Sequence, residues 1–434
     1  ALQLGKGRLP WAEFLRSYGP LREYGPGKRD RERPDLHPVS PAESLWYRGL
    51  FARGFFDTPT GPLEFAYIPD DLLALLPPLR PQKAPPPGCP APIPAPESQV
   101  LVNDRILDQA CTMLAALRMG RPSLPGPLPD QVLKGFLQCA GLLDAQGVPA
   151  SEPTRSFLEA SRSDALAHLF RAWLNSTEFN ELRLVPGITC EGNWTNDPLH
   201  TRQVILDLLR QVPGEAWWDL QAFIDGVRER RPDFQRPAGD YDSWFIRSEA
   251  SGEYLRGFEH WAEVDGALIR FLITGPLHWL GVLDLTQGAP VAFRFSKWAG
   301  FLLEGEAAPE MDREEAKLRV YHDGGISLPR LAPRAVRYQV ARFCAWLGEK
   351  EDTYSYRLTP QSLEKARRQG LRIGMLLGLL RRYAVAPPTP RLVRALEYWE
   401  ENGVEARFEQ VTVLRCATPE VLAGLRASKA ARFL

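Results

Sequence analysis

The first 76 residues show a helical hydrophobic pattern followed by a strand-like one. The sequence Ser40-Pro-Ala-Glu places a helix N-cap and a first-turn proline ahead of apolar residues with helical spacing. Two further apolar runs flank the turn-forming residues 57–61, as in a β-hairpin. A helix followed by a short hairpin is typical of the end of a winged-helix domain, so we expect a winged-helix-like unit over residues 1–76.

Residues 77–98 interrupt these patterns with proline. Ten of the 20 residues from 77 to 96 are proline, which fixes φ and removes backbone donors. This composition favours an extended, polyproline-like spacer over a packed element. We therefore interpret residues 77–98 as a linker, and a PxxP ligand for a groove-binding module is the less favoured alternative.

Helical spacing recurs between the linker and residue 312. It covers residues 107–117, 130–143, 166–174, 200–211 and 218–230. The last two helices are joined through Pro213-Gly214, which predicts helix-turn-helix or winged-helix units in a helical domain at 99–250. A further helix at 261–274 and a hairpin with strands at 280–285 and 291–295 predict a winged-helix-like unit over residues 251–312.

The C-terminal segment, residues 313–434, carries its own strand and helix signals. Residues 318–329 predict two short strands around a Gly-Gly turn, and a helix is expected over residues 332–347. Three Thr-Pro pairs place an N-cap residue before a first-turn proline and predict helices that begin after Thr359, Thr389 and Thr418. Alternation over residues 404–415 predicts a strand or hairpin.

Several short motifs lie within this last segment. They are Tyr354-Ser-Tyr-Arg-Leu-Thr-Pro-Gln-Ser-Leu-Glu-Lys-Ala, Gly370-Leu371, Leu376-Leu377, Pro388, Trp399 and Val411-Thr-Val-Leu-Arg. Over residues 317–434 they resemble the helicase-associated domain, which is similar to the N-terminal domain of XPB-type DNA helicases. Upstream, the winged-helix portions of bacterial proteins with this domain resemble Trp46-Tyr-Arg-Gly-Leu, Gly275-Pro-Leu-His-Trp-Leu-Gly and Phe293-Arg-Phe-Ser.

The expected fold is therefore α+β and mostly helical, with tandem winged-helix-like units followed by a small C-terminal α/β helicase-associated domain. The resemblance implies a protein that works beside a helicase or on DNA, as in DNA repair, with a helicase or nuclease as its protein partner. The sequence has no G-x-x-x-x-G-K-[ST] motif, because Gly5-Lys6-Gly7 lacks the upstream glycine and the hydroxyl residue. We do not expect the chain itself to be the motor.

The sequence contains none of the common catalytic or metal-binding motifs. Its six histidines form no HExxH arrangement, its six cysteines form no CxxC pair, and no G-x-S-x-G occurs. We therefore assign no enzymatic activity, cofactor or metal, and expect reduced thiols. Without a signal-peptide pattern or a window of 18 apolar residues, we expect a cytoplasmic protein with no membrane partner.

Charge adds a local signal to a neutral chain. The 53 Lys and Arg balance the 53 Asp and Glu, so bulk charge indicates no nucleic-acid partner. Residues 353–434, however, contain 14 Lys and Arg against seven Asp and Glu. Cations near the ends of predicted helices are candidates for phosphate contacts: Arg228, Arg230, Arg231, Lys365, Arg367, Arg368, Arg372, Arg381 and Arg382. A solvated surface is the alternative interpretation of these residues.

Two functions follow from these patterns. The first is a non-catalytic DNA-binding accessory protein that contacts phosphates through Arg-rich helices. The second is a protein–protein adaptor that docks on a helicase or nuclease without binding DNA itself. The positive C-terminal segment favours the first function, and the neutrality of the whole chain favours the second.

Overall fold

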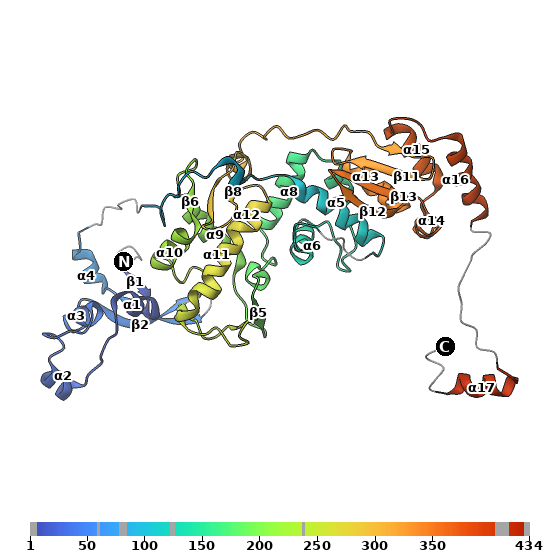
Figure 1. Cartoon of the computed structure of the whole chain (residues 1–434). Helices are drawn as coiled ribbons and strands as arrows, with labels where there is room; N and C mark the ends of the chain where they lie inside the picture. The colour runs from blue at the N-terminus through green and yellow to red at the C-terminus, as the bar shows by residue number, and fades with distance from the viewer. Residues whose placement is uncertain are drawn as a thin grey trace. The chain divides into compact units, whose positions relative to one another are not determined.

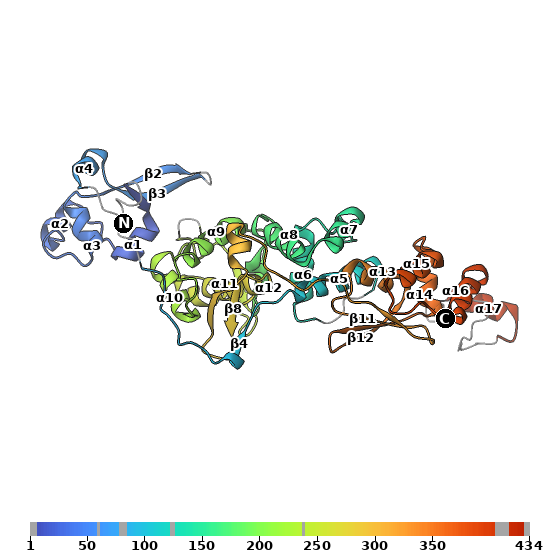
Figure 2. The ribbon, with the colours of Figure 1, turned by 90° about the horizontal axis from the view of Figure 1, so that it is seen from above.

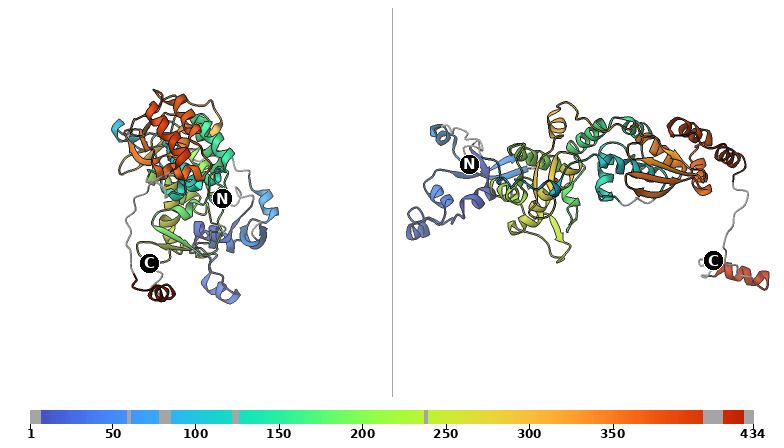
Figure 3. Two further views of the ribbon diagram at one scale, coloured as in Figure 1. Left: turned by 90° about the vertical axis from the view of Figure 1, so that its right-hand side faces the viewer. Right: turned by 45° about the horizontal axis from the view of Figure 1, so that its top comes forward.

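The computed structural model describes residues 7–58, 61–77, 85–121, 126–236, 239–403 and 416–428. About 47% of the described residues are helical and about 15% form strands of small antiparallel sheets, which confirms a mixed class in which helix predominates. The chain divides into two compact units. Unit 1 contains Ala1–Ala316 and Arg330–Gln339, and unit 2 contains Lys317–Pro329 and Val340–Leu434. Figures 1 and 3 show the elements of both units.

Unit 1 begins with a three-stranded sheet and four helices. These elements are β1 (Arg8–Pro10), α1 (Trp11–Tyr18), α2 (Pro26–Glu32), α3 (Pro41–Tyr47), β2 (Ala52–Thr58), β3 (Gly61–Tyr67) and α4 (Asp70–Leu75). The strands are antiparallel in the order β1-β3-β2. Phe14, Ala42, Phe51 and Ala66 form the buried core. The predicted helix after Ser40 and the hairpin that follows it are confirmed.

The start of α3 also anchors the loop that precedes it. The Ser40 hydroxyl accepts a hydrogen bond from the backbone nitrogen of Glu43 (3.0 Å). The buried Glu43 carboxylate accepts from Arg22 Nη2 (2.7 Å) and from the backbone nitrogen of Val39 (2.7 Å). Hydrogen bonding from Arg22 outweighs burial and holds the pKa of Glu43 below its usual range. Glu43 therefore ties residues 22–39 to the helix.

The remainder of unit 1 is mostly helical. Its helices are α5 (Arg105–Arg118), α6 (Asp130–Cys139), α7 (Ser151–Glu159), α8 (Arg162–Leu174), α9 (Pro198–Leu209), α10 (Leu220–Arg230), α11 (Ala267–Thr274) and α12 (Pro276–Trp279). Short 3-10 or π-helical turns are η1 (Pro96–Ser98), η2 (Glu181–Leu184), η4 (Phe258–His260), η5 (Ala262–Gly266) and η6 (Gly300–Glu304). A sheet of order β4-β8-β9-β6 contains β4 (Gln99–Val100), β6 (Trp218–Asp219), β8 (Leu283–Thr286) and β9 (Ala292–Phe295), and β5 (Ile188–Glu191) pairs with β7 (Phe245–Ser248).

In this region the sequence predicted the hairpin correctly and the start of one helix incorrectly. The expected hairpin around residues 287–290 is confirmed as β8 and β9. The helix expected from residue 218 begins only at Leu220, because Trp218 and Asp219 pair with β9. The connection between α9 and α10 therefore has ten residues and contains a strand, so it is longer than the turn of a helix-turn-helix.

The described part of the proline-rich segment, residues 85–98, packs against α10 and β6. Trp218 Nε1 donates a hydrogen bond to the carbonyl oxygen of Pro87 (2.8 Å). The backbone of Gly88 lies so close to α10 that a Cβ on Gly226 would stand 2.6 Å from the Gly88 nitrogen. The absence of a side chain on Gly226 thus allows the segment to lie on the helix.

A buried arginine fixes the connection between α8 and η2. Arg202, on α9, donates from Nε to Glu181 Oε1 (2.6 Å). Its other nitrogens donate to the carbonyl oxygens of Leu174 (3.2 Å), Ser176 (2.7 Å) and Phe179 (2.6 Å). Both charged side chains are almost fully buried. The loop conformation therefore depends on one guanidinium that satisfies several buried acceptors.

Unit 2 combines a four-stranded antiparallel sheet with helices. Its strands, in the order β10-β11-β13-β12, are β10 (Arg319–Val320), β11 (Gly325–Pro329), β12 (Ala345–Lys350) and β13 (Thr353–Arg357). Its helices are α14 (Pro360–Arg368), α15 (Ile373–Tyr383), α16 (Pro390–Asn402) and α17 (Pro419–Ala427), and α13 (Arg334–Phe343) begins in unit 1 and ends in unit 2. Figure 2 shows α14 and α15 on one side of the sheet.

The sequence predictions for unit 2 are largely confirmed. Strands occur within residues 318–329, and α14, α16 and α17 begin at the prolines of the three Thr-Pro pairs. The helix expected over residues 332–347 ends at Phe343, because Ala345–Lys350 instead pairs with β13. The strand or hairpin predicted over residues 404–415 lies outside the described residues. None of the helices that the structure describes is both long enough and apolar enough to span a membrane.

We predict a large loss of stability for Arg202→Met, because the buried Glu181 carboxyl and three backbone carbonyl oxygens would lose their arginine partner. Breaking a buried ion pair in this way costs about 3–5 kcal/mol. The matched control is Arg210→Met at the C-cap of the same helix, where the arginine makes exposed ion pairs with Asp207 (3.0 Å) and Glu304 (3.6 Å) that contribute less than about 1 kcal/mol. Urea unfolding of the two variants would contradict this account if both lost the same stability.

Two helix glycines are predicted to respond in opposite directions to alanine. Gly226→Ala would place a methyl group against the backbone of Gly88, and such overpacking destabilises by about 1–3 kcal/mol. Gly378, on α15, has no other atom within 4 Å of an added Cβ, so Gly378→Ala should raise the free energy of unfolding by about 0.5–1 kcal/mol through helix propensity. Chemical denaturation measures both changes, and stabilisation by both substitutions would refute the close contact at Gly226.

Candidate nucleic-acid interface

Three helices of unit 2 bury one face and expose the other. In α14, Leu363 and Ala366 are buried, and in α16 Leu392 and Leu396 are buried. In α15 the buried residues recur at helical spacing, at Ile373, Leu376, Leu377 and Leu380. The cationic residues of these helices therefore lie on the outward faces.

We call the exposed cations of α14, α15 and α16 the basic surface. It contains the six residues predicted from the sequence, Lys365, Arg367, Arg368, Arg372, Arg381 and Arg382, all of which are exposed. Two further exposed arginines, Arg391 and Arg394, belong to it and were not predicted. Their position was hidden in the sequence because α16 carries two arginines followed by three glutamates, and only packing shows which side is outward.

The predicted residues form two groups rather than one. Lys365, Arg367, Arg368 and Arg372 lie around the end of α14 and the start of α15, whereas Arg381 and Arg382 lie at the other end of α15. At a rise of 1.5 Å per residue, the nine residues from Arg372 to Arg381 separate the groups by about 13 Å along the helix. The backbone nitrogen of Ile373 donates to Glu400 Oε1 of α16 (2.8 Å), which fixes the start of α15.

The cations differ in whether a carboxylate neutralises them. Arg367 and Arg368 both pair with Glu364, at 3.0 and 3.4 Å. The hydrogen bond from Arg367 is the main cause that holds the pKa of Glu364 below its usual range. The guanidinium of Arg382 lies 5.2 Å from the centre of the Tyr383 ring. Within the described ranges, no ion pair involves Lys365, Arg372, Arg381, Arg382, Arg391 or Arg394.

The three candidates in unit 1 have different surroundings. Arg228 is half-buried and its guanidinium lies 5.1 Å from the ring centre of Phe258. Arg230 donates to the carbonyl oxygens of Pro85 and Pro86, the latter at 3.1 Å. Arg231 is exposed at the end of α10. Two of these three side chains are thus held by contacts within unit 1, whereas the basic surface belongs to unit 2.

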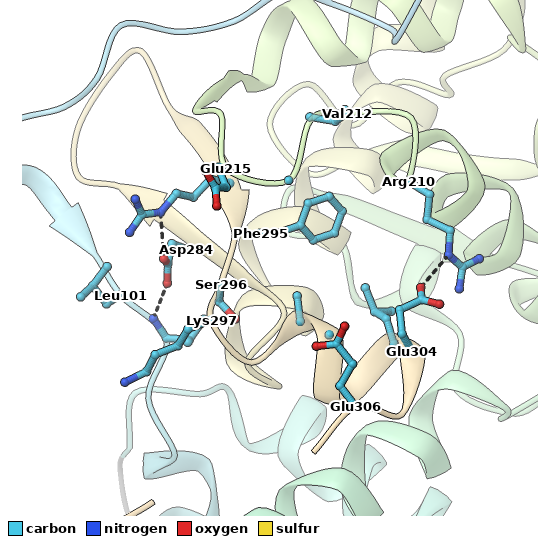
Figure 4. Close-up of a pocket in the computed structure, with 16 residues that line it drawn as sticks. Leu101, Arg210, Val212, Glu215, Asp284, Phe295, Ser296, Lys297, Glu304 and Glu306 are labelled. Atoms are coloured by element: carbon cyan, nitrogen blue, oxygen red, sulfur yellow. Dashed lines mark hydrogen bonds and ion pairs between the residues drawn. The ribbon is translucent and has the colours of Figure 1, made fainter. Parts of the chain in front are cut away.

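A cavity of about 1020 Å³ lies in unit 1 between β8, β9 and η6 (Figure 4). Its wall carries charges of both signs, from Arg210, Glu215, Asp284, Arg294, Lys297, Glu304 and Glu306. Arg294 Nε donates to Asp284 (3.1 Å), and Arg210 pairs with Glu304 (3.6 Å). Most of the charge is therefore neutralised inside the wall. Such a cavity has no excess of one sign that would select a phosphate group.

The described residues offer no site for metal chemistry. Among them, no group of three or more His, Cys, Asp or Glu side chains is arranged to hold a metal ion. The acidic side chains of unit 1 with the deepest burial, such as Glu181, Asp265 and Asp104, each contact an arginine instead. Their geometry serves ion pairing within the fold.

Comparison with known proteins adds no assignment. The sequence matches no model of a known protein family, and it matches no curated protein. The function is therefore inferred from the chemistry of the basic surface.

Proposed function

We propose that this chain is a non-catalytic DNA-binding accessory protein that acts with a helicase or another DNA-processing machine. The observation that carries the proposal is the set of six exposed cations of the basic surface that no carboxylate of the described residues neutralises. Residues 353–403 contain nine Lys and Arg against four Asp and Glu, in a chain that is neutral overall. Phosphate contacts by such cations release counterions and provide most of non-specific DNA affinity.

The shape of α15 supports a close approach of a phosphate backbone. Gly374 and Gly378 lie one turn apart on the exposed part of the helix, and an added Cβ at either position would meet no atom within 4 Å. Arg382 follows one turn later on the same side. A helix face without side chains next to a cation admits a strand more closely than a face of long side chains.

Two further features support a helicase or nuclease as the protein partner. The motifs of residues 317–434 resemble the helicase-associated domain, and the helix and hairpin of the first 76 residues, with sheet order β1-β3-β2, are compatible with a winged-helix-like unit. Both suggest a place beside a helicase or nuclease, in the cytoplasm, as in DNA repair.

The alternative function, a protein–protein adaptor, is supported by arginines of unit 1 that make contacts within the unit. Arg228 and Arg230, expected to contact phosphates, are held by Phe258 and by the carbonyl oxygens of Pro85 and Pro86. An adaptor that docks on a helicase or nuclease without touching DNA needs none of these cations to be free. The salt dependence of DNA binding separates the two functions.

We predict steep salt dependence for DNA binding. Six phosphate contacts correspond to a slope of about −5.4 in a plot of log affinity against log salt concentration, because each contact contributes about −0.9 on duplex DNA. Arg381→Glu combined with Arg382→Glu should reduce the magnitude of the slope by about 2. The matched control, Arg155→Glu with Arg171→Glu, changes the net charge equally at exposed positions of α7 and α8 and should leave the slope unchanged. Absence of binding at low salt would refute the DNA-binding function and favour the adaptor.

Removal of one carboxylate should strengthen DNA binding. Glu364→Gln frees Arg367 and Arg368 from their ion pairs, and we expect affinity at low salt to rise by about two- to fivefold. Glu397→Gln is the control, because Glu397 is exposed on α16 and makes no ion pair among the described residues. Fluorescence anisotropy with a labelled duplex measures both variants. Equal effects would show that only net charge matters and that Glu364 does not mask the two arginines.

A further inference from the structure

Strand β2 is an unprotected sheet edge. It is the outer strand of the β1-β3-β2 sheet and pairs with β3 without a register shift, from Ala52 opposite Tyr67 to Thr58 opposite Gly61. Figure 2 shows the β2–β3 hairpin extending beyond helices α1 and α3. The opposite edge, β1, has only three residues and ends at Pro10. Long regular edges without proline, bulges or cover are templates for pairing with another strand.

The other edge strands in the described part of the chain are shorter or irregular. Strands β4, β6 and β10 have only two residues each, and β5 and β7 have four each. Strand β12 has six residues, but its register shifts between Trp346 and Gly348, and it ends at Lys350. A bulge and a terminal lysine both oppose edge pairing. Strand β2, with seven residues and no register shift, stands apart from them.

The register identifies which residues of β2 point away from the sheet. Pro62 of β3 stands opposite Asp57 and has no N–H, so the hydrogen-bonded pairs of this antiparallel ladder fall on Ala52, Gly54, Phe56 and Thr58. The backbone groups of Arg53, Phe55 and Asp57 therefore face outward. These three residues also have exposed side chains on one face, and Phe55 is 72% exposed.

The outward residues of one β2 strand are complementary to those of a second copy. If a second β2 strand pairs antiparallel across a two-fold axis at Phe55, then Phe55 faces its own copy, and Arg53 faces Asp57 of the other chain in both directions. Opposite charges and aromatic rings that face each other directly across antiparallel strands are stabilising pairs. Two-fold symmetry uses the same patch on both chains and closes after two copies.

We propose that β2 is a homodimerisation edge, where two copies of this chain pair antiparallel around Phe55. Both charges can take part in this pairing, although Arg53 already makes two ion pairs within its own chain. The Asp57 carboxylate has no ion-pair partner among the described residues, and Arg53 directs Nε to Glu64 and Nη1 to Glu23. Its Nη2 remains to reach Asp57 of the second copy. The inference is independent of the DNA-binding function.

Pairing through β2 alone should give a weak assembly of two chains. Pairing of a seven-residue strand buries less area than a standard stable interface, which corresponds to association in the micromolar range or weaker. Sedimentation equilibrium of the full chain, from low micromolar to several hundred micromolar, should show the mass rising toward two chains and no further. A chain that stays monomeric throughout, or that continues to larger oligomers, overturns the proposal.

A charge reversal tests the proposed register. Asp57→Arg places arginine opposite Arg53 of the second copy at both ends of the strand pair, and we expect the dimer dissociation constant to rise at least about tenfold. Asp30→Arg is the matched control: it makes the same charge change on exposed α2, at a side chain 76% exposed, and should leave the constant unchanged. Equal association of Asp57→Arg and the unmodified chain overturns the register.

A cysteine at the symmetry axis gives an independent measurement. Phe55→Cys brings two thiols across a hydrogen-bonded pair whose Cα atoms are about 5.5 Å apart, within disulfide range. Mild oxidation should link two chains through residue 55, and peptide mapping should distinguish this link from links through the native cysteines. Asp30→Cys serves as the control for random encounter. If residues 55 and 30 cross-link to the same extent, β2 is not the interface.

Discussion

The guanidinium of Arg162 is the contact on which the middle of unit 1 depends. It is buried and donates to Asp104 (2.5 Å), Asp108 (2.8 Å) and Glu314 (2.8 Å). Arg330 contacts Asp104 and Asp108 as well, at 2.9 and 3.0 Å. Burial alone would raise the pKa of Asp104, but Arg162 and Arg330 outweigh it and hold the pKa below its usual range. Because buried charges are tolerated only when fully paired, this cluster fixes α5, α8 and two later segments together.

The same requirement divides the arginines of the chain into two populations. Arg162, Arg202 and Arg236 of unit 1 are buried against carboxylates, and their charges do not reach solvent. The arginines of α15 and α16 are exposed, and most have no such partner among the described residues. The neutral total of the sequence is the sum of an acidic excess over residues 1–352, with 46 Asp and Glu against 39 Lys and Arg, and an equal cationic excess over residues 353–434. Only the second population is available to a polyanion.

The sequence predicted features that are decided within a few residues. The helices after Thr359 and Thr389 begin where an N-cap and a first-turn proline place them. The end of α13 and the start of α10 were predicted incorrectly, because Ala345–Lys350 and Trp218 pair with strands that local periodicity does not show. The six basic positions of α14 and α15 were predicted as candidates, but their carboxylate neighbours and the outward position of Arg391 depend on packing.

The β2 edge and the basic surface use different interactions, so both can act in one assembly. Pairing along β2 depends on backbone hydrogen bonds, on Phe55 and on only two ion pairs, so it weakens less with salt than the phosphate contacts on the basic surface. The edge uses only Arg53, Phe55 and Asp57, and leaves α14–α16 of each copy free. A dimer would therefore carry two basic surfaces on one assembly. Binding of the second surface to the same DNA becomes intramolecular, and its effective concentration raises the affinity without any new contact.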